Sequence, residues 1–394
     1  MPEYIYNCAI IHYGEIALKG KNRLYFENKL KNNIKKVLYG VDIKEIERLQ
    51  GRFVIHLSDK ISEDLIAGKL KKVFGIAYFS FGVAVSKDIT KIQETAWSLL
   101  NGKTFHTFKI AAHRAQKEFA LNSLEINKQV GAYVQARCGK KVDLTHPQAV
   151  CFIEIAGPYA LLYTNKYCGL RGLPVGVSER AVSLLSSGID SPVSSYFMLK
   201  RGVNLVYAHF HSQPFTSKAS QENTERLVQI LNQYQFRSKI YFLPFIDIQK
   251  EIMTRAPIEL RVLLYRRYMI RLADRIAKIE KATALVTGEN VGQVASQTLS
   301  NIRVVGEVTS LPILRPLAGF DKEEIIQQAK EIGTFEISTE PYEDCCSLFV
   351  PPNPETRAHP KALFEAEKML DVEELLHKAM EHAEVKILQL AGAV

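Results

Sequence analysis

The 394-residue sequence lacks the features that mark secreted, membrane-spanning and disulfide-stapled proteins. Its six cysteines form no CxxC pair, and a chain of this length needs no disulfide framework, so we expect reduced thiols. The longest weakly polar run, residues 74–86, is too short to span a bilayer. The first residues have no basic start followed by an apolar stretch, so we expect no secretory signal. These absences predict a cytoplasmic protein with no membrane partner.

What is present is an ordinary globular composition with an uneven distribution of charge. Apolar residues make up 47% of the chain and charged residues 24%, and the length predicts two or three domains. Residues 1–176 hold 26 Lys and Arg against 15 Asp and Glu, a balance of +11, within a net charge of +9 for the whole chain. Such a basic module is typical of polyanion binding, and an ordinary basic domain with solvated lysines is an equally weighted alternative.

The N-terminal part has the pattern of α+β structure and ends in a segment rich in Gly and Pro. A basic helix at 23–39 repeats apolar residues at helical spacing, and Gly157 and Pro158 indicate a turn between two strands. Further helices are predicted at 62–73, 89–100 and 123–137, and strands at 4–13, 44–48, 52–57, 104–112, 149–156 and 159–165. The segment GLRGLPVG, residues 169–176, is the predicted linker.

Beyond the linker, predicted strands alternate with predicted helices. The strands are placed at 181–185, 204–211, 239–243 and 284–287, and the helices at 192–201, 219–236, 247–254, 260–278 and 322–332. This alternation predicts an α/β domain with a doubly wound parallel sheet that binds its ligand at the carboxyl ends of the strands. Residues 360–389 are expected to be helical and polar, with no assigned chemistry.

The sequence LLSSGIDSP joins the first strand of this part to its first helix. Gly188 would allow a tight turn, and the small Ser186 and Ser187 would leave backbone N–H groups accessible. Ser191 is expected to cap the helix, with Pro192 at its first position. Exposed N–H groups before a helix N-terminus form an anion site, and an ordinary capped strand-to-helix turn is the alternative.

Asp190 lies inside this loop and is a poor neighbour for a phosphate unless it orients the loop or holds Mg²⁺. The loop resembles the SGGxDS pyrophosphate loop of enzymes that cleave ATP to AMP and pyrophosphate, with Ser187 where the pattern has a glycine. If that position needs a left-handed backbone, a β-carbon costs roughly 1–2 kcal/mol. A return to glycine is therefore expected to leave activity intact or to lower the Michaelis constant for ATP.

Further motifs extend this resemblance along nearly the whole chain, and in the same order. They are YGEIALKGKNRLYFENKL at 13–30, THUMP-like residues at 104–114, HFHSQPFTS at 209–217, TGENVGQVASQT at 287–298, RPLAGFDKEEI at 315–325 and PYEDCC at 341–346. On these residues the chain is identified as a member of the tRNA 4-thiouridine synthetase family. The resemblance implies a ferredoxin-like domain at 1–60, a THUMP RNA-binding domain at 61–168 and a PP-loop ATP pyrophosphatase domain at 177–394.

The resemblance also implies a two-stage reaction on uridine 8 of tRNA. The uridine carbonyl oxygen attacks the α-phosphate of ATP, with Mg²⁺ accompanying the nucleotide, and sulfur then replaces the AMP. The sulfur arrives as a persulfide from a cysteine desulfurase partner. The ATP contacts carried over from the family are Leu184, Leu185, Ser186, Ser187, Gly188, Ser191, His209, Phe210, Arg266, Gly288 and Gln297. Asp190 and Lys322 are the implied catalytic residues at the phosphates, with a solvated Lys322 as the alternative.

For sulfur transfer, the resemblance assigns Cys346 as the persulfide carrier, and Cys345 is one candidate for the resolving thiol. Two inert buried cysteines are the alternative, because acidic neighbours disfavour a thiolate. The chain ends at Val394 without the rhodanese-like domain of longer members, so we expect the form that lacks it. Val262 and Tyr265 stand where some relatives have cysteines, so no iron–sulfur cluster is expected. A homodimer is left open.

Three alternatives remain at this stage. His209 and His211 share a strand face and suit a metal pair, but no third ligand is evident, so no metal site is expected. A different ATP pyrophosphatase acting on a small metabolite would share the loop without needing the basic module. A THUMP-type RNA-binding protein with a degenerate nucleotide domain would need no ATP chemistry. Tests of pyrophosphate release with and without tRNA separate the last two alternatives from a tRNA sulfurtransferase.

Overall fold

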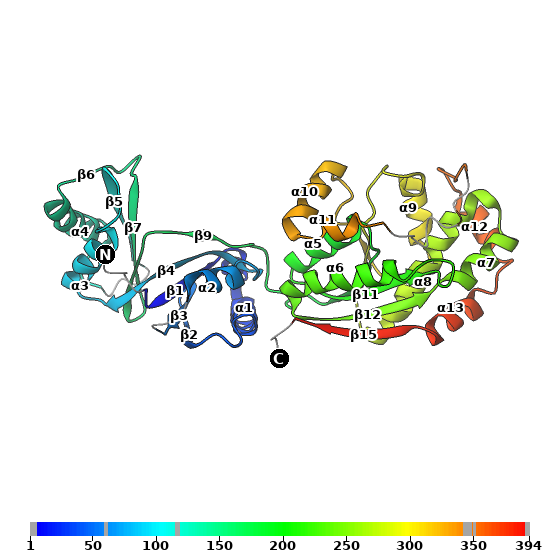
Figure 1. Cartoon of the computed structure of the whole chain (residues 1–394), viewed down its shortest axis with the longest axis horizontal. Helices are drawn as coiled ribbons and strands as arrows, with labels where there is room; N and C mark the ends of the chain where they lie inside the picture. The colour runs from blue at the N-terminus through cyan, green and yellow to red at the C-terminus, as the bar shows by residue number, and fades with distance from the viewer. Residues whose placement is uncertain (1–5, 59–61, 115–118, 342–348, 350–351, 391–394) are drawn as a thin grey trace. The chain divides into compact units, whose positions relative to one another are not determined.

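The computed structural model describes residues 6–58, 62–114, 119–341, 349 and 352–390. The chain divides into two compact units, with the boundary between residues 174 and 175. The boundary lies inside the predicted linker. The predicted classes are confirmed, because the first unit is α+β and the second is a doubly wound α/β domain (Figure 1). In the described ranges, no helix is both long and apolar enough to cross a membrane.

The first unit is built on a single sheet with the strand order β2-β3-β1-β4-β8-β7-β5-β6, and β9 pairs with β4. Its long central strand β4, Ile76–Ser86, pairs with β1 along one edge and with β8 along the other. No strand was predicted in this apolar stretch, which was expected only to be too short to span a membrane. The other strands are β1 Cys8–Tyr13, β2 Ile43–Leu49, β3 Arg52–Leu57, β5 Thr107–Arg114, β6 Lys141–Val142, β7 Ala149–Ala156, β8 Tyr159–Tyr163 and β9 Tyr167–Cys168.

Four helices pack with this sheet, and their ends follow local sequence signals. The helices are α1 Arg23–Val37, α2 Glu63–Leu70, α3 Ile89–Leu100 and α4 Ser123–Cys138. Asn122 and Glu125 form a capping box at the start of α4, and Gly139 ends it in the left-handed conformation. Apolar faces of α3 and α4 pack on β5, β7 and β8 in one core cluster.

The second unit contains a six-stranded sheet with the order β14-β13-β10-β11-β12-β15. Five strands run parallel, namely β10 Arg180–Leu184, β11 Asn204–His211, β12 Arg237–Pro244, β13 Ala284–Val286 and β14 Ile313–Leu314. The chain winds from β10 toward β12 on one side and later returns to β13 and β14 on the other. The switch of direction lies between β10 and β13, and sheets of this class bind ligands in the crevice at that point.

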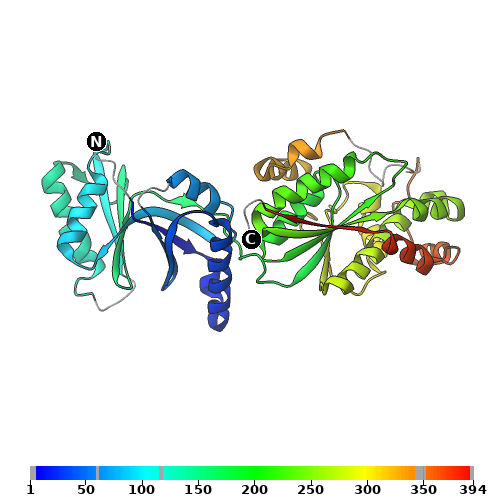
Figure 2. The same cartoon turned by 60° about the horizontal axis from the view of Figure 1, so that its bottom comes forward.

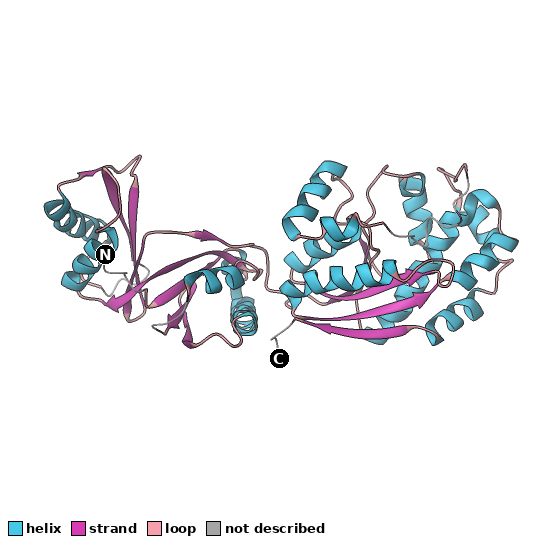
Figure 3. Ribbon diagram, in the orientation of Figure 1, coloured by secondary structure: helices cyan, strands magenta, loops and turns pink. Residues whose placement is uncertain are grey.

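Helices cover both faces of this sheet. In Figure 2 the green α5 and α6 lie on one face and the yellow-green α8 lies on the other, and Figure 3 shows the same separation of helices from strands. A large core cluster joins the apolar side of α8 to β10, β11 and β12. The helices are α5 Asp190–Lys200, α6 Ala219–Gln235, α7 Ile246–Arg255, α8 Arg261–Glu280, α9 Leu299–Gly306, α10 Lys322–Ile332, α11 Phe335–Ser338, α12 Pro360–Glu367 and α13 Val372–Glu381.

The prediction that residues 360–389 are all helical is wrong at its end. After α12 and α13 the chain forms β15, Glu384–Gln389, which pairs antiparallel with β12 at the edge of the sheet (Figure 2). The helices are anchored by Glu367, whose buried carboxylate receives hydrogen bonds from Arg267 and Arg271 on α8. The C-terminal stretch therefore completes the sheet and braces α8.

Candidate active site

A pocket opens at the carboxyl ends of β10 and β13, at the switch point of the parallel sheet. Seven of the residues predicted to bind ATP or to act in catalysis line it, namely Leu184, Ser186, Asp190, Ser191, Arg266, Gly288 and Gln297. The lining also includes residues that the sequence analysis did not select, namely Met269, Ile270, Thr287, Glu289 and Val305. Met269, Ile270 and Val305 supply an apolar wall, whereas the loop after β10 supplies the polar one, as expected for a site that orients a ligand with few polar groups.

Ser191 holds the loop together from inside rather than capping the helix. α5 begins at Asp190, its N-cap is Ile189, and no side chain caps it, so the predicted cap at Ser191 is wrong. The buried Ser191 hydroxyl instead accepts a hydrogen bond from the Ser186 N–H at 2.9 Å and donates to the Ser186 carbonyl at 3.1 Å. This double contact closes the loop over the start of α5.

The backbone of Ser187 carries no left-handed strain. Outside glycine, the described residues with positive φ are Arg171, Phe236 and Lys281. Ser187 is fully buried and its hydroxyl lies 3.2 Å from that of Ser220 on α6. The condition under which a β-carbon would be strained here, a left-handed backbone, is therefore not met.

Gly288 is required by close packing between β13 and the start of α5. A β-carbon at Gly288 would lie 2.8 Å from the backbone nitrogen of Ser191 and 2.9 Å from its α-carbon. Both neighbours are backbone atoms of a helix start and cannot move aside as a flexible side chain would. Glycine therefore lets the strand end approach the loop and keeps both sides of the pocket together.

The carboxylate of Asp190 is held by two side chains from other elements. Lys322 Nζ lies 2.5 Å from Asp190 Oδ1, and Gln293 Nε2 donates to Oδ2 at 3.0 Å. Lys322 is presented by the first turn of α10, whose N-cap Asp321 forms a capping box with Glu324. The two predicted catalytic residues, distant in sequence, are thus brought into contact at the pocket.

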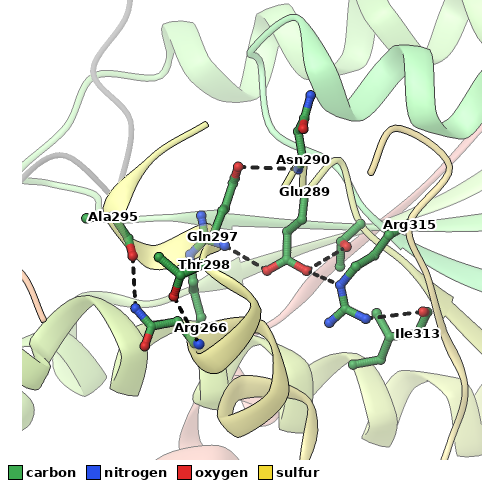
Figure 4. Close-up of polar contacts among 10 residues, drawn as sticks. Arg266, Glu289, Asn290, Ala295, Gln297, Thr298, Ile313 and Arg315 are labelled. Carbon is green, nitrogen blue, oxygen red and sulfur yellow. Dashed lines mark hydrogen bonds and ion pairs between the residues drawn. The ribbon is translucent and has the colours of Figure 1, made fainter. Parts of the chain in front are cut away.

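A buried carboxylate fixes the arginine on the wall of the pocket (Figure 4). Glu289 Oε1 accepts from Arg266 Nη1 at 2.7 Å, and Oε2 accepts from Arg315 Nε at 2.7 Å and from the Thr287 hydroxyl at 3.0 Å. Burial opposes ionisation of Glu289, but the two guanidinium groups outweigh it and hold its pKa below the usual value. Two arginines against one carboxylate leave a surplus positive charge, and Arg266 presents it to the pocket.

The segment after β13 is braced by its own side chains. Gln297 Oε1 accepts a hydrogen bond from the backbone N–H of Asn290 at 3.3 Å, as Figure 4 shows. The Gln297 carbonyl accepts from the Gly292 N–H at 2.9 Å, and the Asn290 amide donates to the Phe320 carbonyl. This bracing places Gln293 over Asp190 and Gln297 in the pocket wall.

Six predicted site residues do not line the pocket, namely Leu185, Ser187, Gly188, His209, Phe210 and Lys322. Leu185 and Ser187 are buried within the loop itself, and His209 and Phe210 are buried on β11. Gly188 accepts a hydrogen bond from the Ser338 hydroxyl at its carbonyl, at 3.3 Å. These assignments stay predictions. Among the described residues, no group of three or more His, Cys, Asp or Glu could hold a metal ion.

The predicted sulfur carrier Cys346 and its neighbour Cys345 lie outside the described residues. The described chain before them runs through α11, and Ser338 at the end of α11 contacts the loop at Gly188.

Glu289, Gln293 and Thr287 are the polar site residues that sequence reasoning missed. All three fall within the quoted motif TGENVGQVASQT, so the motif was recognised without its internal roles. The available signal was charge: an arginine predicted to contact ATP, Arg266, is commonly held by a carboxylate, and Glu289 is the acidic residue in that motif.

A loop that closes on a helix start, at the switch point of a doubly wound sheet, defines a nucleotide-binding α/β domain of the PP-loop class. Family models agree: "Thiamine biosynthesis protein (ThiI)" matches residues 176–372, "ThiI ferredoxin-like domain" matches 8–80 and "THUMP domain" matches 86–165. The chain therefore belongs to the ThiI family.

Individual proteins support the same assignment. The chain is 42% identical over 382 residues to a probable tRNA sulfurtransferase of Moorella thermoacetica, covering 97% of each chain. It is 39% identical to the probable tRNA sulfurtransferase of Thermus thermophilus, covering 95% of this chain and 92% of the other. Its fold matches a crystal structure of a 4-thiouridine synthetase–RNA complex with bound ATP, with a TM-score of 0.88, 38% identity and coverage of 98% and 100%.

Proposed function

We propose that this protein is an ATP-dependent tRNA sulfurtransferase that converts a uridine of tRNA, at position 8, to 4-thiouridine. The observation that carries the proposal is the pocket at the switch point, where a PP-loop, Arg266 and the Asp190–Lys322 pair converge. The similar 4-thiouridine synthetase of known structure binds ATP and RNA, and relatives across nearly the full length are named tRNA sulfurtransferases.

The chemistry proceeds in two stages. In the first, the carbonyl oxygen at C4 of the uridine attacks the α-phosphorus of ATP, and pyrophosphate leaves. In the second, a persulfide sulfur attacks C4 and AMP leaves with that oxygen. Activation is needed because a carbonyl oxygen is a poor leaving group, whereas AMP is a good one. A second thiol, for which Cys345 is the candidate, then attacks the carrier sulfur, so that 4-thiouridine leaves with the outer sulfur and a disulfide forms, which a dithiol reductant returns to two thiols. The other products are AMP and pyrophosphate.

The residues of the pocket have separate tasks in the first stage. The loop around Ser186 and the start of α5 hold the phosphates, because a helix N-terminus favours anions. Lys322 neutralises charge that develops on the departing pyrophosphate, and Arg266, fixed by Glu289, presents positive charge from the opposite wall. Asp190 is a carboxylate at the pocket and suits Mg²⁺, which would supply charge neutralisation when bound with ATP.

The tRNA partner is assigned to the first unit. A hollow of about 580 Å³ in that unit is lined by aromatic rings, by Lys109 and Lys166, and by Arg52, which is buried and ion-paired with Glu154. The Lys166 ammonium lies 3.9 Å from the ring centroid of Phe152, and the His12 ring stacks on Tyr78 with 4.2 Å between centroids. Positive charge next to partly buried rings suits phosphates and unpaired bases, which is how proteins commonly hold RNA.

Sulfur is proposed to arrive as a persulfide on Cys346, loaded by a cysteine desulfurase. The support is the resemblance of PYEDCC, residues 341–346, to the cysteine motif of the family. A thiol that carries sulfur must alternate between a donor protein and the activated base. We also propose three domains, at residues 1–60, 61–168 and 177–394.

The direct test is pyrophosphate release from labelled ATP by the full chain, with tRNA, with candidate metabolites and alone. Release that depends on tRNA supports the proposal. Release that depends on a small amide acceptor or ligase substrate supports a metabolite-modifying enzyme, and no release under any condition supports an RNA-binding protein with an inactive nucleotide domain. An unmodified transcript is the substrate of choice, and a transcript with cytidine at position 8 is its control.

A further inference from the structure

The hydroxyl of Ser187, in the position where the family pattern has glycine, is part of a buried hydrogen-bonded chain. Ser187 Oγ lies 3.2 Å from Ser220 Oγ, and Ser220 Oγ lies 3.3 Å from His209 Nε2. Ser187 is fully buried, and Ser220 and His209 are 5% and 2% exposed. A buried hydroxyl without a partner is costly, so each member of the chain depends on the next one.

The direction of every hydrogen bond in the chain follows from its end. His209 Nδ1 lies 2.9 Å from the carbonyl oxygen of Leu185, which can only accept, so Nδ1 carries the proton. In a neutral ring Nε2 is then an acceptor, and the Ser220 hydroxyl donates a hydrogen bond to it. The oxygen of Ser220 is left to accept, and Ser187 donates to it. A glycine at position 187 cannot supply this donor.

A second contact supports the same proton placement on the His209 ring. Thr224 Oγ1 donates to the Ser220 carbonyl at 2.8 Å and lies 3.2 Å from His209 Nδ1. Its lone pair therefore faces the Nδ1 proton, which is shared between Thr224 and Leu185. The ring is thus held by α6 on one side and by the phosphate loop on the other.

We infer that His209 is a positioning residue for the phosphate loop, acting directly on Leu185 and through Ser220 on Ser187. The inference rests on the proposed function only in taking ATP as the ligand of the loop. The imidazole holds the loop at Leu185 and, through Ser220, at Ser187, whereas Ser191 holds it at Ser186 and Ser338 holds it at Gly188. A loop held in this way meets the phosphates without reorganising, so the row of hydrogen bonds from His209 to Ser187 raises the affinity for ATP.

This inference reverses the expectation for a return to the family glycine. Ser187→Gly and Ser187→Ala both remove the hydroxyl that donates to Ser220. The Ser220 oxygen then accepts no hydrogen bond from the loop, although it still donates one to His209. One buried hydrogen bond corresponds to a loss of about 3- to 10-fold in ATP affinity. Ser220→Ala should produce the same loss, and the Ser187→Ala/Ser220→Ala double variant should be no weaker than either single variant, because both act through one chain.

The test measures displacement of a fluorescent ATP analogue by ATP on the full chain, and both Michaelis constants in tRNA-dependent pyrophosphate release. Ser238→Ala is the matched control. Its hydroxyl is 3% exposed, belongs to another buried chain with Gln235 and Asn232, and lies at the opposite end of the sheet from the loop. We expect the three loop-chain variants to raise the Michaelis constant for ATP and not that for tRNA. Ser238→Ala should change only thermal stability.

Two substitutions of His209 separate the direct contact from the relayed one. His209→Asn retains an N–H donor near the Nδ1 position and loses the Nε2 acceptor, so it should match Ser220→Ala. His209→Ala loses both contacts and should bind ATP more weakly than either. Equal ATP affinity in all folded variants, or losses that multiply in the Ser187/Ser220 pair, would overturn the inference. Wild-type protein that binds ATP but releases no pyrophosphate with tRNA overturns the proposed function instead, and absence of ATP binding overturns both.

Discussion

Lys322 Nζ lies 2.5 Å from Asp190 Oδ1, although 132 positions separate the two residues in the sequence. The lysine comes from the first turn of α10 and the aspartate from the first turn of α5, so two helix starts meet at one carboxylate. The pair is partly exposed, with 44% of the Lys322 side chain and 21% of that of Asp190 accessible. Exposed ion pairs contribute little stability, so Lys322 can exchange its contact with Asp190 for a contact with a phosphate at little cost.

Asp190→Asn should abolish pyrophosphate release and leave tRNA affinity within about 3-fold of wild type. The amide keeps the shape of the side chain but loses the charge that Lys322 and a magnesium ion require. Because the RNA-binding surface is assigned to the other unit, binding of tRNA measured by filter retention should be unaffected. Asp371→Asn, at the N-cap of α13, is the control for loss of an aspartate. A folded Asp190→Asn protein with full activity would contradict the assignment.

Gly288→Ala should weaken ATP binding by more than about 10-fold and destabilise the second unit. The new β-carbon would lie 2.8 Å from the Ser191 nitrogen, so either β13 or the start of α5 must shift. Overpacking of this kind costs about 1–3 kcal/mol. Isothermal calorimetry with ATP checks the affinity, and Gly319→Ala is the control, because its β-carbon would meet no atom within 4 Å.

Glu289→Gln should remove a pH-dependent part of the stability. The pKa of Glu289 is held below its usual value of 4.5, so its stabilising effect is complete above that value and is lost as pH falls through the folded-state pKa. At pH 7 the variant should be less stable by about 1–3 kcal/mol, since the partly buried Arg266 and Arg315 lose their charged partner.

Thermal melts from pH 7 to pH 3 check this sign. The gap between wild type and Glu289→Gln should be constant near neutrality and should narrow below pH 4.5. Glu307→Gln is the control, because its partner Arg303 is an exposed neighbour on the same helix, and its melting curve should follow wild type. A gap that widens toward low pH would contradict the proposed charge state.

Lys166→Ala should weaken tRNA binding and flatten its salt dependence. If the ammonium contacts one phosphate, the slope of log affinity against log salt should fall by roughly 0.7–0.9. Lys361→Ala, on α12 in the second unit, removes an equal charge and should leave the slope unchanged. Fluorescence anisotropy with labelled tRNA at several salt concentrations measures both. An unchanged slope in Lys166→Ala would remove this residue from the RNA surface.

Cys346→Ser should still release pyrophosphate in the presence of tRNA and should form no 4-thiouridine. The first stage needs the loop, Lys322 and the uridine, whereas the second needs a thiol that carries sulfur. Cys345→Ser should approach the wild-type yield in a single turnover with dithiothreitol, because a reductant replaces a resolving thiol. Full thiolation by Cys346→Ser with a desulfurase as donor would exclude its role, and loss in Cys345→Ser alone would exchange the two assignments.

The sequence predicted those parts of the fold in which local signals agree. The helix over Lys322–Ile332 carries a capping box and a terminal glycine, and both of its predicted ends match the structure. β15 was missed because its alternating residues follow two helices without a Gly or Pro to mark the change. β4 was missed because an apolar strand buried between β1 and β8 shows no alternation until its neighbours are known.

The site was predictable as a loop, but not as a network. LLSSGIDSP identified the phosphate loop from its residues, yet the position of Ser191 within it required the structure. The partners of Ser187 and Glu289 lie 33, 23 and 26 positions away, at Ser220, Arg266 and Arg315. The local sequence pattern does not predict which of these residues are in contact, because the contacts depend on how the sheet brings β11, β13 and α6 together.

The conversion of uridine 8 to 4-thiouridine is measured by nucleoside mass spectrometry of tRNA treated with the purified full-length protein. The reaction contains an unmodified transcript, ATP, magnesium and a cysteine desulfurase with cysteine as sulfur source. The account predicts 4-thiouridine at position 8, with one AMP released for each sulfur inserted, and none when ATP is replaced by an analogue that cannot be cleaved between its α- and β-phosphates. Absence of 4-thiouridine from a folded protein that binds both ATP and tRNA would contradict it.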